Sequence, residues 1–228
     1  GRITIFGKEI SRITAEDRRK IGVVWSDAGF SGYLMGKDLI AVLKNMYPAF
    51  DESWFGKKCE EFHLPMDKKL KDFSTGMKAK LKVLSAIANE DARLLILDEP
   101  TAGMDVMVRE QILDLLREFM MPGDRSILIS SHISSDLEGF CDDVYLMNHG
   151  KIVLHEDVDI LLEQYGILKV TPEQYDTLDK EYLLRVKKED YGYACLTGQK
   201  DFYQENWPQV IVEKGTIDQV MTMMVEGK

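Results

Sequence analysis

The sequence predicts an α/β protein: a parallel sheet core, an inserted helical subdomain and a small α+β appendage at the C-terminus. Residues 94–97 form a continuous apolar run, typical of a strand buried on both faces of a parallel sheet. A second short strand is expected at 127–130 after a helix, and a β–α–β order implies a right-handed crossover within one parallel sheet. From residue 166 the chain changes to short strand candidates and one capped helix.

Composition limits the function classes. With 228 residues the chain is long enough for one large domain, or for one domain and an appendage. A net charge of −10 argues against a nucleic-acid partner. No apolar run approaches the roughly 18 residues that span a bilayer, and no signal peptide is expected. Three distant cysteines are expected to be reduced thiols of a cytosolic protein: Cys59, Cys141 and Cys195.

The N-terminal half is expected to hold strands and then helices. Residues 2–6 are typical of a strand with a turn at Gly7, and a second strand over 21–25 ends before Ser26 and Asp27. Helices are expected over 35–47 and 51–62. The segment 31–89 would form the helical subdomain. Its aromatic residues either pack internally or contribute to a docking groove.

Two adjacent acids, Asp98 and Glu99, follow the apolar run directly. Ligands of open parallel sheets bind beyond the carboxyl ends of the strands, and buried carboxylates are costly unless a cation meets them. We therefore expect one of these two acids to hold a hard cation such as Mg2+ and the other to orient or deprotonate water. The alternative is a strand end with two solvated acids.

Ser74 is expected to cap a helix that runs to about residue 89, and Gly76 would let a ligand approach its backbone. Free amides and the positive end of the helix dipole favour an anion there. An ordinary capped helix is the alternative. Three lysines add positive charge, as solvated helix faces often do: Lys78, Lys80 and Lys82.

Downstream, Asp105 is expected to cap the next helix. His132 lies two residues past the second buried strand, so it would share a sheet edge with Glu99. It either contacts a ligand there or serves a structural role.

The order of these elements resembles the ATPase domain of ABC proteins. Residues 73–77 (Phe-Ser-Thr-Gly-Met) resemble its signature, Asp98 and Glu99 its Walker B acid and catalytic glutamate, 101–105 its D-loop and His132 its switch histidine. The resemblance implies a P-loop NTPase-like ATPase domain over residues 1–165 and an accessory domain over 166–228.

The resemblance also assigns roles. Glu99 and His132 would be catalytic, and Asp98 would hold Mg2+ through water. Thr75 replaces the usual first glycine of the signature and Met77 the usual glutamine. Ser26 stands where the family has a glutamine that reaches the metal. Ser26 or Asp27 could act there through a water, or both could merely turn the chain towards Gly29. The implied nucleotide-binding residues are Ser74, Thr75, Gly76, Met77, Asp105 and Ser26.

A phosphate loop of the pattern G-x-x-x-x-G-K-[ST] is not found in these 228 residues. We expect that the protein either lacks its first segment or continues upstream of the residues given. The chain alone is therefore expected to bind no ATP tightly and to be inactive. The four partial matches have the wrong spacing or residues: Gly7-Lys8, Gly36-Lys37, Gly56-Lys57 and Gly150-Lys151.

The implied function is an ATP-hydrolysing subunit that powers an ABC transporter, in particular an exporter of drugs or peptides, using ATP and Mg2+. Its partners would be a transmembrane subunit and a second ATPase subunit in a head-to-tail dimer. It would be cytoplasmic and peripheral on the inner face of the membrane. A soluble ABC-type ATPase and a nucleotide-independent regulatory or interaction module remain as alternatives.

The C-terminal third is expected to hold a hairpin around 148–150, a helix over 158–165 and strands at 182–186, 193–196 and 209–212. Thr216 and Gln219 form a capping box for a last helix. Its methionine-rich face either packs on these strands or binds a partner.

Overall fold

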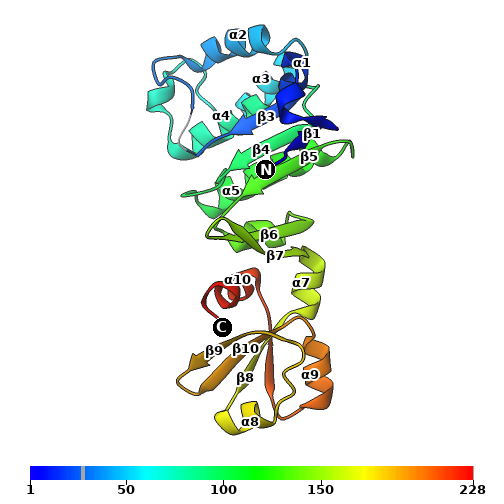
Figure 1. Ribbon diagram of the computed structural model, residues 1–228. Helices are drawn as coiled ribbons and strands as arrows, with labels where there is room; N and C mark the ends of the chain where they lie inside the picture. The colour runs from blue at the N-terminus through cyan, green and yellow to red at the C-terminus, as the bar shows by residue number, and fades with distance from the viewer. Residues whose placement is uncertain (27–28, 228) are drawn as a thin grey trace. The chain divides into compact units, whose positions relative to one another are not determined.

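The computed structural model describes residues 1–26 and 29–227, so Asp27 lies outside the described residues (Figure 1). The chain divides into two compact units, Gly1–His132 and Ile133–Lys228. The expected sequence division at 165/166, into an ATPase domain and an accessory domain, remains a prediction.

The first unit is built on a parallel sheet of three strands in the order β3 (Ile21–Val24), β4 (Leu94–Asp98) and β5 (Ser126–Ser130). Helix α5 (Val106–Met120) connects β4 to β5, so the expected β–α–β unit is confirmed (Figure 1). Parallel pairing puts the carboxyl ends of all three strands at one edge. The residues after these strands are thereby brought together.

One face of this sheet is covered by α4 (Thr75–Ile87) and α5. Leu95 and Leu97 of β4 are fully buried, whereas Val23 and Leu128 on the neighbouring strands are 42% and 62% exposed. The expectation of burial on both faces is therefore wrong for this sheet. An apolar run does not predict whether one or both faces of a strand are covered, because the elements that cover them are distant in sequence.

Helix α4 approaches β3 closely at Gly22. A Cβ atom there would lie 2.7 Å from the backbone oxygen of Ala86 and 2.6 Å from Leu95 Cδ2. Any larger residue would have to push the helix off the strand. The packing of Val83 and Leu84, both fully buried, fixes the helix further.

The chain enters the first unit through a hairpin, β1 (Thr4–Ile5) with β2 (Lys8–Glu9), followed by a 3-10 turn (Ile10–Arg12) and α1 (Ala15–Arg19). The expected strand over 2–6 is wrong in its extent. Phe6 and Gly7 have positive φ angles of 51° and 74°, as the central residues of a two-residue hairpin turn do. The strand therefore ends at Ile5.

The helical segment contains α2 (Gly36–Met46), α3 (Glu52–Glu61) and a 3-10 turn (Leu70–Asp72), and it leads into α4. Both expected helices are confirmed to within a residue at each end. Phe55 is fully buried beside Phe50, and Tyr33 is 80% exposed. The aromatic residues of this segment thus divide between core and surface.

The second unit begins with α6 (Ser134–Glu138), the hairpin β6 (Asp143–Asn148) and β7 (Lys151–Asp157), and α7 (Val158–Gln164). An antiparallel sheet follows in the order β11–β8–β10–β9. Its strands are β8 (Gly166–Val170), β9 (Leu183–Glu189), β10 (Gly192–Thr197) and β11 (Ile211–Lys214). The three expected strands are confirmed with shifted bounds, and β8, which pairs with β10 and β11, is an addition.

Helices cover both faces of this sheet. On one face α10 (Ile217–Glu226) and α7 bury Val220 and Leu161 against Ile167 and Leu196. On the other, α8 (Pro172–Thr177) and α9 (Lys200–Asn206) enclose Leu168 and Tyr203. The capping box of Thr216 is confirmed, and the apolar face of α10 packs on its own sheet.

All three cysteines are free thiols, as expected. Burial raises the pKa of Cys59 to about 11 and that of Cys195 to about 12. Among the described residues, no helix combines the length and the hydropathy that a membrane-spanning segment requires.

Candidate active site

Asp98 ends β4 at the carboxyl edge of the parallel sheet. Its carboxylate accepts hydrogen bonds from two hydroxyls, Ser26 Oγ to Oδ2 and Ser130 Oγ to Oδ1, each at 2.8 Å. The parallel register places Ser130 directly opposite Asp98. The hydroxyl of Ser26, followed by that of Ser130, lowers the pKa of Asp98 below its ordinary value. Asp98 is therefore an anion at neutral pH, with both oxygens oriented.

Glu99 turns the chain away from the strand in a left-handed conformation, with φ at 48°. Such a conformation is uncommon for a residue with a side chain and is found disproportionately at functional sites. The backbone N–H of Glu99 donates to the backbone oxygen of Ser130 at 3.0 Å, which fixes this turn to β5. The side chain of Glu99 is thereby directed to the chain that follows β5.

His132 meets Glu99 there. Its Nδ1 lies 2.7 Å from Glu99 Oε2, and its backbone N–H donates to the same oxygen at 3.3 Å. The His132 side chain is 69% exposed and that of Glu99 only 26%. Because Nδ1 faces Glu99, the imidazole ring presents Nε2 to a ligand from solvent. The expected meeting of the acid pair and the histidine at one sheet edge is present in the structure.

The donor set at Asp98 fits a hard cation. A carboxylate and two serine hydroxyls are oxygen ligands of the kind that Mg2+ prefers. Among the described residues there is no cluster of three or more His, Cys, Asp or Glu side chains that could hold a metal. A magnesium ion at Asp98 would therefore need oxygens from water and phosphate, as it does in nucleotide sites.

The other expected site residues lie at the first turns of α4 and α5. Ser74 Oγ accepts from the backbone N–H of Met77 at 3.2 Å, so Ser74 caps α4 and Thr75 opens it. Asp105 Oδ1 accepts from the backbone N–H of Val108 at 3.0 Å and caps α5. Both expected caps are confirmed.

Gly76 brings these two helix starts together. A Cβ atom at Gly76 would lie 3.2 Å from Val108 Cγ1, which is closer than side chains ordinarily pack. A larger residue at this position would therefore require the Val108 side chain to shift by a few tenths of an ångström. Close approach of a ligand to the same backbone remains a prediction.

Sequence reasoning missed two residues of this region. Ser130 was part of the second strand without a role, yet its register opposite Asp98 follows from aligning the two parallel strands. Lys82 belongs to the three lysines of α4 whose pattern is typical of a solvated helix face. Its position between the buried Leu81 and Val83 was the signal that could have set it apart.

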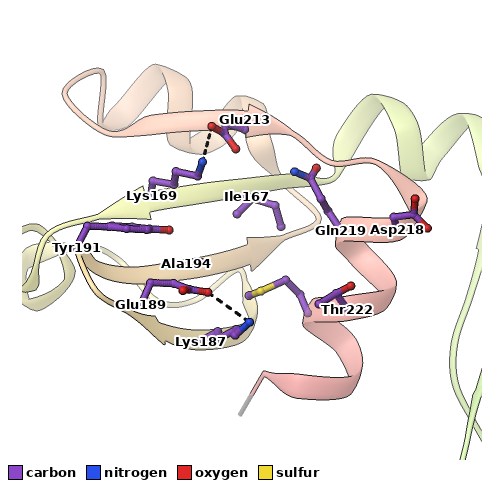
Figure 2. Close-up of a pocket in the computed structure, with 11 residues that line it drawn as sticks. Ile167, Lys169, Lys187, Glu189, Tyr191, Ala194, Glu213, Asp218, Gln219 and Thr222 are labelled. Atoms are coloured by element: carbon purple, nitrogen blue, oxygen red, sulfur yellow. Dashed lines mark hydrogen bonds and ion pairs between the residues drawn. The ribbon is translucent and has the colours of Figure 1, made fainter.

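A hollow of about 390 Å³ lies in the second unit, between α10 and the open part of its sheet (Figure 2). Ile167 and Ala194 form its floor. Lys169 pairs with Glu213 at 2.6 Å, and Lys187 lies 3.4 Å from Glu189, so both cations at its rim face carboxylates. A neutralised rim offers little attraction for phosphate groups, and we place no nucleotide there.

The family model for "ABC transporter" matches residues 1–102. The ATP-binding protein YtrB of Bacillus subtilis is 33% identical over 57% of this chain and 44% of its own length. The lantibiotic transport protein SrtF of Streptococcus pyogenes is 34% identical over 70% of this chain and 68% of its own. The bacitracin transport protein BcrA of Enterococcus faecalis is 28% identical over 87% and 64%. The chain belongs to the ATP-binding proteins of ABC transporters.

Solved structures show the same fold. An ATP-binding subunit of an ABC transporter superposes with a TM-score of 0.61 at 24% identity, over 72% of this chain and 70% of the other. A dimeric ATP-binding cassette with ADP and Pi gives 0.58 at 18% identity, over 69% and 73%. The fold is thus that of ABC ATPase domains, with a P-loop NTPase-like core. The chain spans about 44% of the length of the first relatives it matches.

Proposed function

We propose that this chain is part of an ATP-hydrolysing subunit that powers an ABC transporter. The observation that carries the proposal is the arrangement at one sheet edge, where Asp98 is oriented by two hydroxyls and Glu99 is held by His132. An ionised carboxylate beside a second carboxylate paired with histidine is suited to phosphoryl transfer, in which catalysis is positioning plus charge stabilisation.

Asp98, Glu99 and His132 are proposed to have separate roles in ATP hydrolysis. Bound Mg2+ would neutralise charge on the phosphates. Asp98 would hold that ion through water, since its carboxylate is already oriented by Ser26 and Ser130. Glu99 orients the attacking water and receives its proton. His132 keeps Glu99 in place through Nδ1 and contacts the γ-phosphate through Nε2.

A second subunit would complete the site. Ser74, Thr75, Gly76 and Met77 place backbone amides at the positive end of the α4 dipole, which favours a phosphate. Asp105 lies at the neighbouring helix start, joined to α4 through the contact of Gly76 with Val108. We propose that these residues close over the γ-phosphate held by the opposite subunit in a head-to-tail dimer. One structural neighbour is a dimeric ATP-binding cassette bound to ADP and Pi, which supports this assembly.

The transported substrate is proposed from the relatives. Their names refer to bacitracin, lantibiotic and Nod factor transport, which supports an exporter of drugs or peptides. The partner would then be a transmembrane subunit, with this chain on the cytoplasmic face of the membrane. A soluble ABC-type ATPase is the alternative, and co-purification with a membrane subunit separates the two.

Titration of ATP with Mg2+ tests the proposal. The 228-residue chain is expected to show no tight binding, because its sequence has no G-x-x-x-x-G-K-[ST] loop. A chain extended upstream to include such a loop is expected to bind and to hydrolyse ATP, as measured by calorimetry and phosphate release. If the extended chain also ignores ATP, the function is that of a nucleotide-independent regulatory or interaction module.

A further inference from the structure

Lys82 reaches from the middle of α4 to the end of β3. Its ammonium group donates to the backbone oxygens of Trp25 at 3.0 Å and of Ser26 at 3.2 Å. Hydrogen bonds from a charged donor are about twice as strong as neutral ones. Lys82 therefore ties the main chain to α4 at the point where the strand ends.

The helix that carries Lys82 is itself fixed to the sheet. Gly22 lets α4 lie against β3 at a distance that no larger residue would allow. Leu81 and Leu84, on either side of Lys82 along the helix, are buried. The packing of α4 thus sets the position of the ammonium group. Through its hydrogen bond, Lys82 holds the backbone of Ser26 at a place that depends on where α4 lies.

Ser26 has a short side chain, with one rotatable bond between its backbone and its hydroxyl. That hydroxyl donates to Asp98 Oδ2 at 2.8 Å. A short side chain can keep such a contact only while its backbone stays in place. The carbonyl that Lys82 holds belongs to the same residue. A continuous series of contacts therefore runs from α4 through Lys82 and Ser26 to Asp98.

Building on the function proposed above, we propose that Lys82 is a positioning residue for the metal-binding carboxylate. It holds Ser26 on Asp98, and it links the position of α4 to the geometry around the metal. Ser74, the cap of helix α4, and Thr75–Met77, its first residues, form the segment proposed to bind phosphate from the opposite subunit. A displacement of α4 would pull Lys82 from the two carbonyls and release one hydroxyl from Asp98.

Hydrogen exchange on the 228-residue chain tests the first part without nucleotide. Lys82→Met is expected to speed exchange of the peptide covering residues 21–26 by about fivefold, the size expected for loss of roughly one hydrogen bond. Lys57→Met is the matched control, since Lys57 is exposed on α3 and carries the same charge. Lys82→Arg should restore most of the protection. Equal exchange in Lys82→Met and Lys57→Met overturns the proposal.

The Mg2+ dependence of ATP hydrolysis by the upstream-extended protein tests whether Lys82 acts on Asp98 through Ser26. Lys82→Met is expected to raise the Mg2+ concentration for half-maximal hydrolysis by about tenfold, with the KM for ATP little changed at saturating metal. Ser26→Ala should add little in the Lys82→Met background, because residues acting in series are not additive. If the double variant instead raises the half-maximal Mg2+ concentration by the product of the two single fold-changes, Lys82 does not act through Ser26 and the proposed link is overturned. If the unmutated extended protein hydrolyses no ATP, the proposed function fails, and hydrogen exchange still decides the role of Lys82.

Discussion

Glu99→Gln in the upstream-extended protein is expected to lower ATP turnover by roughly 10²–10⁴-fold, the usual contribution of a positioned general base. The amide keeps the size of the side chain and one oxygen for the backbone N–H of His132. It cannot receive a proton from the attacking water. Binding of ATP and closure of the dimer do not require that proton transfer, so ATP-driven dimerisation should persist.

Phosphate release measures turnover, and sedimentation with and without ATP measures dimerisation. Glu16→Gln is a suitable control, because Glu16 is an exposed acid of α1 and the substitution removes the same charge. The control should match the unmutated protein in both measurements. Hydrolysis that continues at the normal rate in Glu99→Gln would remove Glu99 from its proposed role.

Phe55→Ala is expected to lower the free energy of unfolding by about 3–5 kcal/mol, the usual cost of truncating a buried phenylalanine. Phe55 is fully buried in α3, and its ring lies 5.4 Å from that of Phe50. The cavity would open between α3 and the chain that leads into it. Trp54, the neighbouring residue, donates from Nε1 to Glu118 of α5 at 3.4 Å and provides a fluorescence signal for urea unfolding.

Tyr33→Ala is the control, because it also removes one aromatic side chain from the helical segment. Tyr33 belongs to the same helical segment, but it is 80% exposed, so its removal should change the free energy of unfolding by no more than about 0.5 kcal/mol. Comparing the two variants separates the effect of losing a buried, packed side chain from the effect of losing any aromatic side chain. Equal losses from Phe55→Ala and Tyr33→Ala would contradict the core placed around Phe55.

Features with a local cause could be predicted from the sequence. Ser74 and Asp105 cap helices because their side chains bond backbone amides three residues ahead, and both caps are present. The apolar run before Asp98 and the strand before His132 pair in parallel. Once two parallel strands are recognised, the residues that follow them must share an edge. That reasoning placed Asp98, Glu99 and His132 together.

Features that depend on tertiary packing could not be predicted. Lys82 looks like a solvated lysine until α4 is seen lying on β3, and its bonds to Trp25 and Ser26 join residues more than fifty positions apart. The exposure of the Leu128 side chain depends on which elements cover the sheet. Strand β8 is a short segment beginning with Gly166, without a polar–apolar alternation to distinguish it.

The most direct measurement is the position of the metal in crystals of the upstream-extended protein grown with ATP and Mn2+, found by the anomalous scattering of manganese. We predict a single peak beside the Asp98 carboxylate, with the γ-phosphate between that metal and the Glu99–His132 pair. Manganese bound elsewhere, with Asp98 still held only by its two serine hydroxyls, would contradict the assignment of this sheet edge as the catalytic site.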